Sequence, residues 1–246
     1  MSKHPNVDLE VMVTCLKDGM IDILKKNSIG FLDIHPDQIE AYRREFLEIY
    51  PGRPVEKNEG GMSIFPLFWL FAVAKWLNPH LIVESGVWRG QSTWMLRKAC
   101  PDAQIHAFDI SLKNLAYKDH TITYHEKDWT KTTIDNSKSG EGLIVFDDHI
   151  NQCRRLREAY DRGFKWAIFD DNVPVTQIER IGVPALPSLG MLFDHRLKEE
   201  DIITWTLHDK KYSYTFSYED TYNARELIDF YLVVPCSTCL TVVKLK

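Results

Sequence analysis

Hydrophobic and polar positions follow two different rhythms along the chain, and the change between them divides the sequence. Before residue 50, apolar residues recur at helical spacing, which predicts helices over residues 7–25 and 36–50. Residues 50–61 then hold two prolines and three glycines among charged residues, a composition that ends helices and strands. We expect a helical extension over residues 1–60 and a main domain over residues 61–246.

After residue 61, short β-type runs alternate with segments of helical length. The predicted strands are residues 81–84, 104–110, 121–126, 143–147 and 166–169. The predicted helices are residues 63–77, 91–100 and 151–163. This alternation is typical of βαβ units and predicts an α/β fold, a doubly wound and mostly parallel Rossmann-like sheet. Ligands of such sheets bind beyond the carboxyl ends of the strands.

Two further β-type runs, residues 229–234 and 240–244, end the sequence and suit a C-terminal antiparallel hairpin. Cys236 and Cys239 form a C-x-x-C in the connection between them. One such pair supplies only half of a tetrahedral zinc site, and a redox pair of this spacing normally opens a helix. We interpret these cysteines as structural thiols.

Composition excludes several classes of protein. Hydrophobic residues make up 44% and charged residues 26%, as in globular proteins, and the net charge of −5 offers no basic excess for a nucleic acid or an anionic membrane. The longest strongly apolar run, residues 67–77, is about half of the roughly 20 residues that a membrane helix needs. Five cysteines and no apolar leader favour a reduced, cytoplasmic protein with a small-molecule substrate. The sequence leaves homo-oligomer formation open.

Polar residues cluster in the turn after the first predicted strand. Glu84 ends that strand, Gly86 and Gly90 stand four apart in the turn, and Ser92 lies where the next helix opens. The free amides of such a helix start suit a polar ligand, but the dinucleotide fingerprint G-x-G-x-x-G is missing. Asp109 ends the next strand, where an acid can accept both hydroxyls of a ribose. The pair of strand-end acids predicts a nucleoside-containing ligand, although each acid alone is more often a surface or capping group.

Two acidic doublets follow the fourth and fifth predicted strands. They are Asp147-Asp148, followed by His149, and Asp170-Asp171, followed by Asn172. Because neighbouring strands lie about 4.8 Å apart, these acids converge, and carboxylate and amide oxygens are the ligands of Mg²⁺ or Ca²⁺. The alternative is that one acid of each doublet caps a helix or binds an arginine such as Arg154 or Arg155.

Together these motifs resemble class I S-adenosylmethionine (SAM)-dependent methyltransferases, and among them the cation-dependent O-methyltransferases typified by catechol O-methyltransferase. Over residues 63–174, the first turn is similar to E-x-G-x-x-x-G-x-S, residues 146–149 to F-L-D-H, and residues 171–173 to D-N-V. The resemblance implies a metal site of Asp148, Asp171 and Asn172. It also implies cofactor contacts from Glu84, Gly86, Gly90, Ser92, Asp109 and His149. Asp128 and Trp129 follow the third predicted strand, where Trp129 could pack on adenine and Asp128 accept a hydrogen bond from its amine, although a tryptophan after a strand is more often part of the core.

The implied reaction is methyl transfer to a small hydroxylated molecule such as a vicinal diol, a sugar or a catechol, with Mg²⁺ or another divalent cation lowering the pKa of the hydroxyl. The catechol enzymes carry a lysine base where this sequence has Asn151, so His149 is the nearest catalytic candidate, as base or as cofactor ligand. The segment after Pro174 resembles an inserted lid, as in the sugar O-methyltransferase and cephalosporin-hydroxylase-like branch. A metal-dependent oxygenase or hydrolase and a non-catalytic cofactor-binding module are the competing hypotheses.

Overall fold

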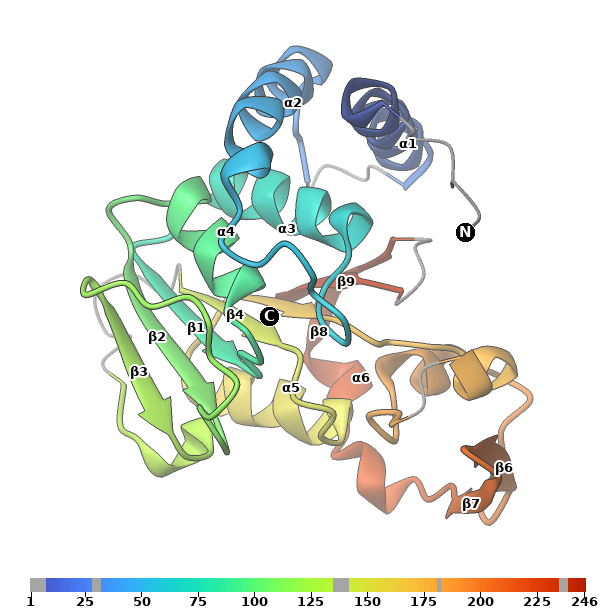
Figure 1. Cartoon of the computed structure of the whole chain (residues 1–246). Helices are drawn as coiled ribbons and strands as arrows, with labels where there is room; N and C mark the ends of the chain where they lie inside the picture. The colour runs from blue at the N-terminus through green and yellow to red at the C-terminus, as the bar shows by residue number, and fades with distance from the viewer. Residues whose placement is uncertain (1–7, 28–31, 135–141, 181–182, 235–238) are drawn as a thin grey trace.

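The protein is built around one central sheet, shown in Figure 1 by a computed structural model that describes residues 8–27, 32–134, 142–180, 183–234 and 239–246. Seven strands follow the order β3-β2-β1-β4-β5-β9-β8, and β1 to β5 pair in parallel. The antiparallel strand β9 joins β5 to β8. The strands are β1 (Leu81–Ser85), β2 (Gln104–Asp109), β3 (Ile122–Glu126), β4 (Leu143–Phe146), β5 (Trp166–Phe169), β8 (Ile228–Val233) and β9 (Thr241–Leu245). The α/β fold with a C-terminal antiparallel hairpin is therefore confirmed.

Helices cover both faces of this sheet. The larger apolar cluster joins one face to α1, α2, α3 and α4, and the second cluster joins the other face to α5 and α6. The helices are α1 (Leu9–Asn27), α2 (Pro36–Ile49), α3 (Ile64–Leu77), α4 (Gln91–Ala99), α5 (Gln152–Asp161) and α6 (Ala224–Leu227). None of the helices in the described ranges is long and apolar enough to cross a bilayer.

Helix α3 is apolar around most of its circumference, which is typical of a helix buried in the core. Its residues 66–74 are all buried, between the sheet and the helices α1 and α2. In Figure 1, α1 and α2 lie outside α3 at the top of the molecule. A division of the chain at residue 60 stays a prediction.

The start of α2 differs in detail from the sequence pattern, in which Asp37 and Glu40 form a capping box. The structure shifts the box by two residues: His35 Nδ1 accepts from the Asp37 amide (3.3 Å), and Gln38 Oε1 accepts from the His35 amide (3.0 Å). Glu40 instead binds Arg43, with Oε2 2.9 Å from its Nε. His35-Pro36-Asp37 thus forms the start of helix α2.

A second hairpin, β6 (Ile202–Leu207) and β7 (Lys210–Thr215), lies apart from the central sheet and was not predicted (Figure 1). Its turn residues His208 and Asp209 have φ values of 48° and 62°, the left-handed pair that a two-residue hairpin turn needs. A small apolar cluster within the segment after Pro174 holds this hairpin to the preceding turns. Of the predicted C-x-x-C, Cys236 lies outside the described residues and Cys239 is buried.

Candidate cofactor and metal site

A cavity of about 260 Å³ opens beyond the carboxyl ends of β1, β2, β3 and β4. Strand β1 pairs with β2 on one side and with β4 on the other, so the strand order reverses between β1 and β4. Doubly wound sheets bind their ligands at such a point. The cavity is lined by Gly60, Ser85, Gly86, Trp88, Asp109, Ile110, Lys127, Asp128, Asp147, Asp148, His149, Ile150 and Arg155.

The turn after β1 requires glycine at Gly86. Its φ is 95°, and a side chain there would collide with the backbone carbonyl of Asp147 at the end of β4. The amide of Gly86 donates to the Phe108 carbonyl (2.8 Å), which fixes the turn against β2. Gly90, with φ 86°, begins α4. Gly86 therefore allows the ends of β1, β2 and β4 to pack together beside the cavity.

Asp109 braces this turn from the end of β2. Its Oδ2 accepts from the amides of Val87 and Trp88, each at 3.0 Å, and its Oδ1 accepts from the amide of Ser111 (3.0 Å). The carboxylate also lines the cavity. Each oxygen can accept more than one hydrogen bond, so Asp109 can hold the turn and still meet a ligand hydroxyl.

The predicted cofactor residues fall into two groups. Those that line the cavity are Gly86, Asp109, Asp128 and His149. Those beneath or beside it are Glu84, Gly90, Ser92 and Trp129. The second group thus supports the cavity from the surrounding structure. These four residues were expected to contact a cofactor directly, but they do not line the cavity.

Glu84 is a fully buried support of this kind. Its Oε2 accepts from Thr93 Oγ1 (2.5 Å), which ties β1 to α4. Burial raises the pKa of Glu84 to about 7, against the smaller opposing effect of the hydrogen bonds from Ser92 and Thr93. A carboxyl here is therefore partly neutral near physiological pH.

The prediction that Trp129 packs on adenine is wrong. Its ring is 0% exposed and packs edge-on against Phe146 and Phe164, with centroids 5.9 and 6.1 Å away. A fully buried ring has no face to offer a ligand. Ile110 and Trp88, exposed by 85% and 40%, supply apolar surface in the cavity instead. The available signal for Ile110 was an apolar residue directly after the strand-end acid Asp109.

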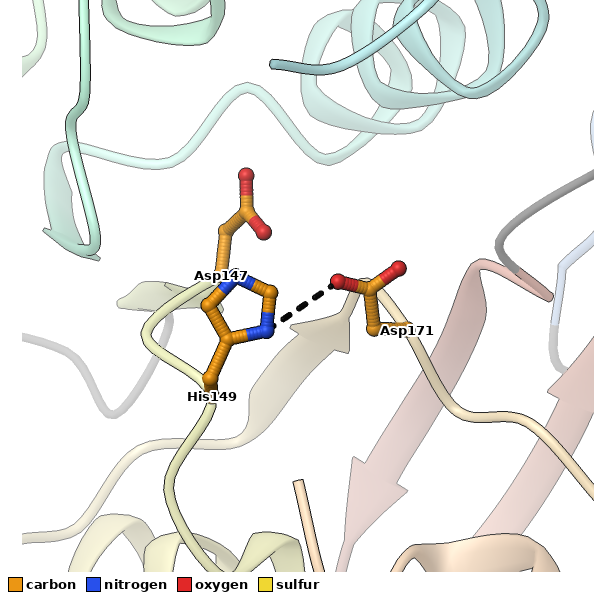
Figure 2. A group of neighbouring side chains, drawn as sticks. All are labelled: Asp147, His149 and Asp171. Atoms are coloured by element: carbon orange, nitrogen blue, oxygen red, sulfur yellow. Dashed lines mark ion pairs between the residues drawn. The ribbon is translucent and has the colours of Figure 1, made fainter. Parts of the chain in front are cut away.

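Asp147, His149 and Asp171 form a cluster at the edge of the cavity, after β4 and β5 (Figure 2). One potential ligand atom from each lies within 4.8 Å of the others, and His149 Nδ1 is 3.3 Å from Asp171 Oδ2. His149 and Asp171 have φ values of 55° and 56°, left-handed turns that aim two different strand ends at one point. Burial and the charges of Asp170 and Asp171 raise the pKa of Asp147 well above its usual range, and burial raises the pKa of Asp171 to about 6.

This set of donors fits a divalent cation. Two carboxylates held this close repel each other unless a positive charge lies between them, and this repulsion adds to burial in raising the pKa of Asp147. An imidazole nitrogen and two carboxylates are an ordinary ligand set for a divalent metal ion.

The predicted metal ligands Asp148 and Asn172 are placed elsewhere. Asp148 Oδ2 accepts from Ser85 Oγ (2.6 Å) and from Arg155 Nε (2.9 Å), so the alternative of an arginine partner for one acid of the doublet is the one the structure shows. The acid that completes the cluster with His149 and Asp171 is Asp147, which the sequence pattern had placed outside the ligand set.

Asn172 is 1% exposed and uses both ends of its amide in structural hydrogen bonds. Its Oδ1 accepts from the Gly190 amide (2.6 Å), and its Nδ2 donates to Thr241 Oγ1 (2.7 Å) and to the Tyr231 hydroxyl (2.8 Å). These partners belong to the segment after Pro174, to β9 and to β8. Asn172 therefore fastens that segment to the sheet, and both ends of its amide are engaged in doing so.

Asn151, at the position of the lysine base in the catechol enzymes, is also structural. Its Oδ1 accepts from the Arg154 amide (2.9 Å) and caps α5, and its Nδ2 donates to the Asp220 carbonyl (3.0 Å). An amide in this role accepts no proton from a substrate.

Comparisons with known proteins give similarities among solved structures. No protein-family model matches the sequence, and no curated protein matches it. The SAH-bound methyltransferase PaMTH1 from Podospora anserina aligns over 100% of both chains, with 15% identity and a TM-score of 0.48. The SAM-bound O-methyltransferase TomG from Streptomyces achromogenes, involved in tomaymycin synthesis, aligns over 92% of this chain and 99% of its own, with 12% identity and a TM-score of 0.49.

A structure described as cmcI-N160 with SAH has higher identity, 21%, and a TM-score of 0.40. That alignment covers 46% of this chain and 64% of the other, so the chain spans less than two thirds of that relative.

Proposed function

We propose that the protein is a SAM-dependent O-methyltransferase that uses a divalent cation and acts on a small hydroxylated molecule. The observation that carries the proposal is the continuity of two sites. Asp147 and His149 belong to the lining of the cavity at the switch point, and they also belong to the cluster with Asp171. A ligand in the cavity would therefore lie beside a bound cation, as a methyl donor and its acceptor require.

The cavity residues suit SAM, which supplies the methyl group on its sulfonium. Gly86 and Asp109 line the cavity, and Asp109 offers carboxylate oxygens to the ribose hydroxyls. Ile110 and Trp88 provide the apolar surface that a purine needs, and Asp128 and Lys127 line the same cavity.

Asp147, His149 and Asp171 would hold the cation. When bound, a divalent cation lowers the pKa of a hydroxyl that reaches it, which makes the oxygen nucleophilic at neutral pH. We assign His149 to cation binding because its Nδ1 already lies against Asp171, and the general-base role is not needed. Asn151 cannot take that role because both ends of its amide are engaged.

The cation cluster supports a substrate that offers two adjacent oxygens. A second space beside the cluster measures only about 10 Å³ and is lined by residues that include Asp147, His149, Asp171 and Ala185. Because this space is too small for a substrate, the acceptor would enter from the larger cavity. A vicinal diol, a sugar or a catechol suits this site because two adjacent oxygens can share one cation.

The competing hypotheses make different predictions. An iron oxygenase of the facial-triad type needs two histidines and one carboxylate, and the cluster found among the described residues has the reverse composition. A non-catalytic module would bind SAM without transferring its methyl group. Calorimetry with SAM and SAH, with and without Mn²⁺ or Mg²⁺, followed by an acceptor screen with methyl-labelled SAM, separates these cases. Absence of SAM binding would contradict the proposal.

A further inference from the structure

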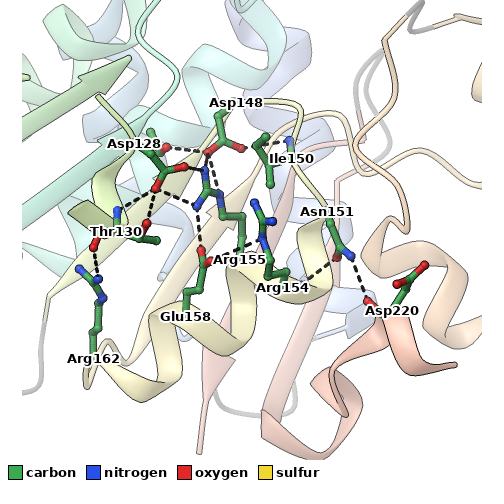
Figure 3. A network of polar contacts seen from close by, with 11 residues as sticks. Asp128, Thr130, Asp148, Ile150, Asn151, Arg154, Arg155, Glu158, Arg162 and Asp220 are labelled. Carbon is green, nitrogen blue, oxygen red and sulfur yellow. Dashed lines mark hydrogen bonds and ion pairs between the residues drawn. The ribbon is translucent and has the colours of Figure 1, made fainter. Parts of the chain in front are cut away.

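Arg155 is a buried arginine of α5 that lines the cavity and binds Asp128 and Asp148, two other lining residues (Figure 3). Its side chain is 2% exposed, and all three guanidinium nitrogens are engaged. Nη2 lies 2.7 Å from Asp128 Oδ2 and 2.8 Å from Asp148 Oδ2, and Nη1 lies 2.7 Å from Glu158 Oε2. One side chain from α5 therefore binds acids that follow β3 and β4.

These contacts use the lone pairs of Asp148. Its Oδ2 accepts from Arg155 Nε and from Ser85 Oγ and lies 2.8 Å from Arg155 Nη2 in an ion pair, and its Oδ1 accepts from the Ile150 amide (3.2 Å). A carboxylate held in this way is a poor metal ligand, because binding a cation would require it to give up a buried ion pair. Asp148 nevertheless lines the same small cavity as Asp147 and Asp171, so only its partners keep it from the cluster.

We propose that Arg155 is a positioning residue that determines which carboxylates reach the cation, and thereby which cation the site prefers. By binding Asp148, it leaves Asp147, Asp171 and His149 as the ligand set. A set with an imidazole nitrogen favours a transition ion such as Mn²⁺ over Mg²⁺, which prefers oxygen ligands alone. If Arg155 is removed, Asp148 becomes free to add a third carboxylate and shift the preference towards Mg²⁺. The inference rests on the proposed function for the presence of a cation.

The test is a double-mutant cycle of metal affinity, measured by calorimetry on the metal-free full-length protein without SAM. The variants are Asp147→Asn, Asp148→Asn, Arg155→Met and the double variant Arg155→Met with Asp148→Asn. Arg154→Met is the matched control, since this neighbouring arginine contacts Glu158 at 3.4 Å and is 40% exposed. Circular dichroism and thermal unfolding establish that each variant is folded. Asp148→Asn leaves Arg155 in place and tests the proposal even if Arg155→Met does not fold.

We expect wild-type protein to bind Mn²⁺ more tightly than Mg²⁺. Asp147→Asn should lower the affinity for Mn²⁺ by about tenfold or more, while Asp148→Asn changes it by less than about threefold. In Arg155→Met, the ratio of Mn²⁺ to Mg²⁺ affinity should fall at least about threefold. In that background, the further substitution Asp148→Asn should lower the metal affinity by about tenfold. Arg154→Met should behave as wild type.

Two results would overturn the inference while the proposed function stands: equal losses from Asp147→Asn and Asp148→Asn with Arg155 present, or an unchanged metal preference in folded Arg155→Met. Failure of wild-type protein to bind either ion would overturn both the inference and the cation in the proposed function.

Discussion

The imidazole of His149 lies 3.3 Å from the carboxylate of Asp171, although the two residues follow different strands and are 22 positions apart in the chain. Both have left-handed backbone conformations, which are uncommon for residues other than glycine. Such conformations persist where the surrounding structure holds them, and they often mark functional sites. The contact therefore gives a geometric reason to place the cation at this pair rather than at Asn172.

The turn after β1 should tolerate no side chain at Gly86. We expect Gly86→Ala to destabilise the protein by about 1 to 3 kcal/mol or more, because the residue has φ 95° and its Cβ would meet the Asp147 carbonyl. Urea unfolding measures the loss. Gly19→Ala is the control, since Gly19 lies in α1 with open space around it, and it should stabilise the protein by about 0.5 to 1 kcal/mol. Similar effects of the two substitutions would contradict this account of the turn.

Asp109 should contribute to cofactor affinity. We expect Asp109→Ala to cost about 1.5 to 3 kcal/mol of SAM binding, as for hydrogen bonds to a charged group, and to loosen the turn that Asp109 braces. Calorimetry measures the dissociation constant, with the exposed Asp102→Ala as control. An unchanged dissociation constant would remove Asp109 from the cofactor site.

Substitutions at Trp129 should change the free energy of unfolding, whereas substitutions at Ile110 should change the affinity for SAM. Trp129→Ala should destabilise the fold by about 3 to 5 kcal/mol, because it empties a fully buried site. Trp129→Phe keeps most of that packing and should leave SAM affinity unchanged. Ile110→Ala should weaken SAM binding and leave the free energy of unfolding nearly unchanged, because Ile110 is 85% exposed. The reverse pattern, with SAM affinity sensitive to Trp129→Phe and not to Ile110→Ala, would restore Trp129 to the adenine site.

Glu84 should make the stability depend on pH. Its pKa is about 7 in the folded protein and near 4.5 in the unfolded chain, so the folded state holds the proton more tightly. The resulting loss of folding stability is absent below about pH 4.5 and grows as the pH rises to about 7, where it reaches a few kcal/mol. We expect Glu84→Gln, which keeps an acceptor for Thr93, to gain stability over wild type progressively between pH 5 and pH 8. A stability difference that is constant across this range would contradict the buried, titrating Glu84.

Much of the fold could be predicted because its signals are local. The central strands β1, β4 and β5 are short, mostly apolar runs that are buried on both faces, and the polar residues that follow the strands mark the carboxyl edge at which the cavity lies. The hairpin β6–β7 was missed because its turn residues, His208 and Asp209, lack the Asn-Gly or Asp-Gly signal of a two-residue turn.

The division of labour within the site could not be predicted because it depends on tertiary partners. Asp147 and Asp148 are adjacent and chemically identical in sequence, and the position of Arg155 on α5 decides which one is neutralised. Trp129 directly follows Asp128, yet one lies in the core and the other lines the cavity. Asn172 fits a ligand pattern, and only the contacts with Gly190, Tyr231 and Thr241 reveal it as a clamp.

We propose that the cavity binds SAM beside a cation held by Asp147, His149 and Asp171. The most direct measurement is the mass-spectrometric detection of methyl transfer from labelled SAM to a panel of catechols, vicinal diols and sugars, with metal-free protein supplemented with Mn²⁺ or left without it. We predict a singly methylated acceptor that forms only with the cation and is lost in Asp147→Ala, while SAM binding by that variant persists. Equal methylation with and without the cation, or undiminished methylation by Asp147→Ala, would contradict the account.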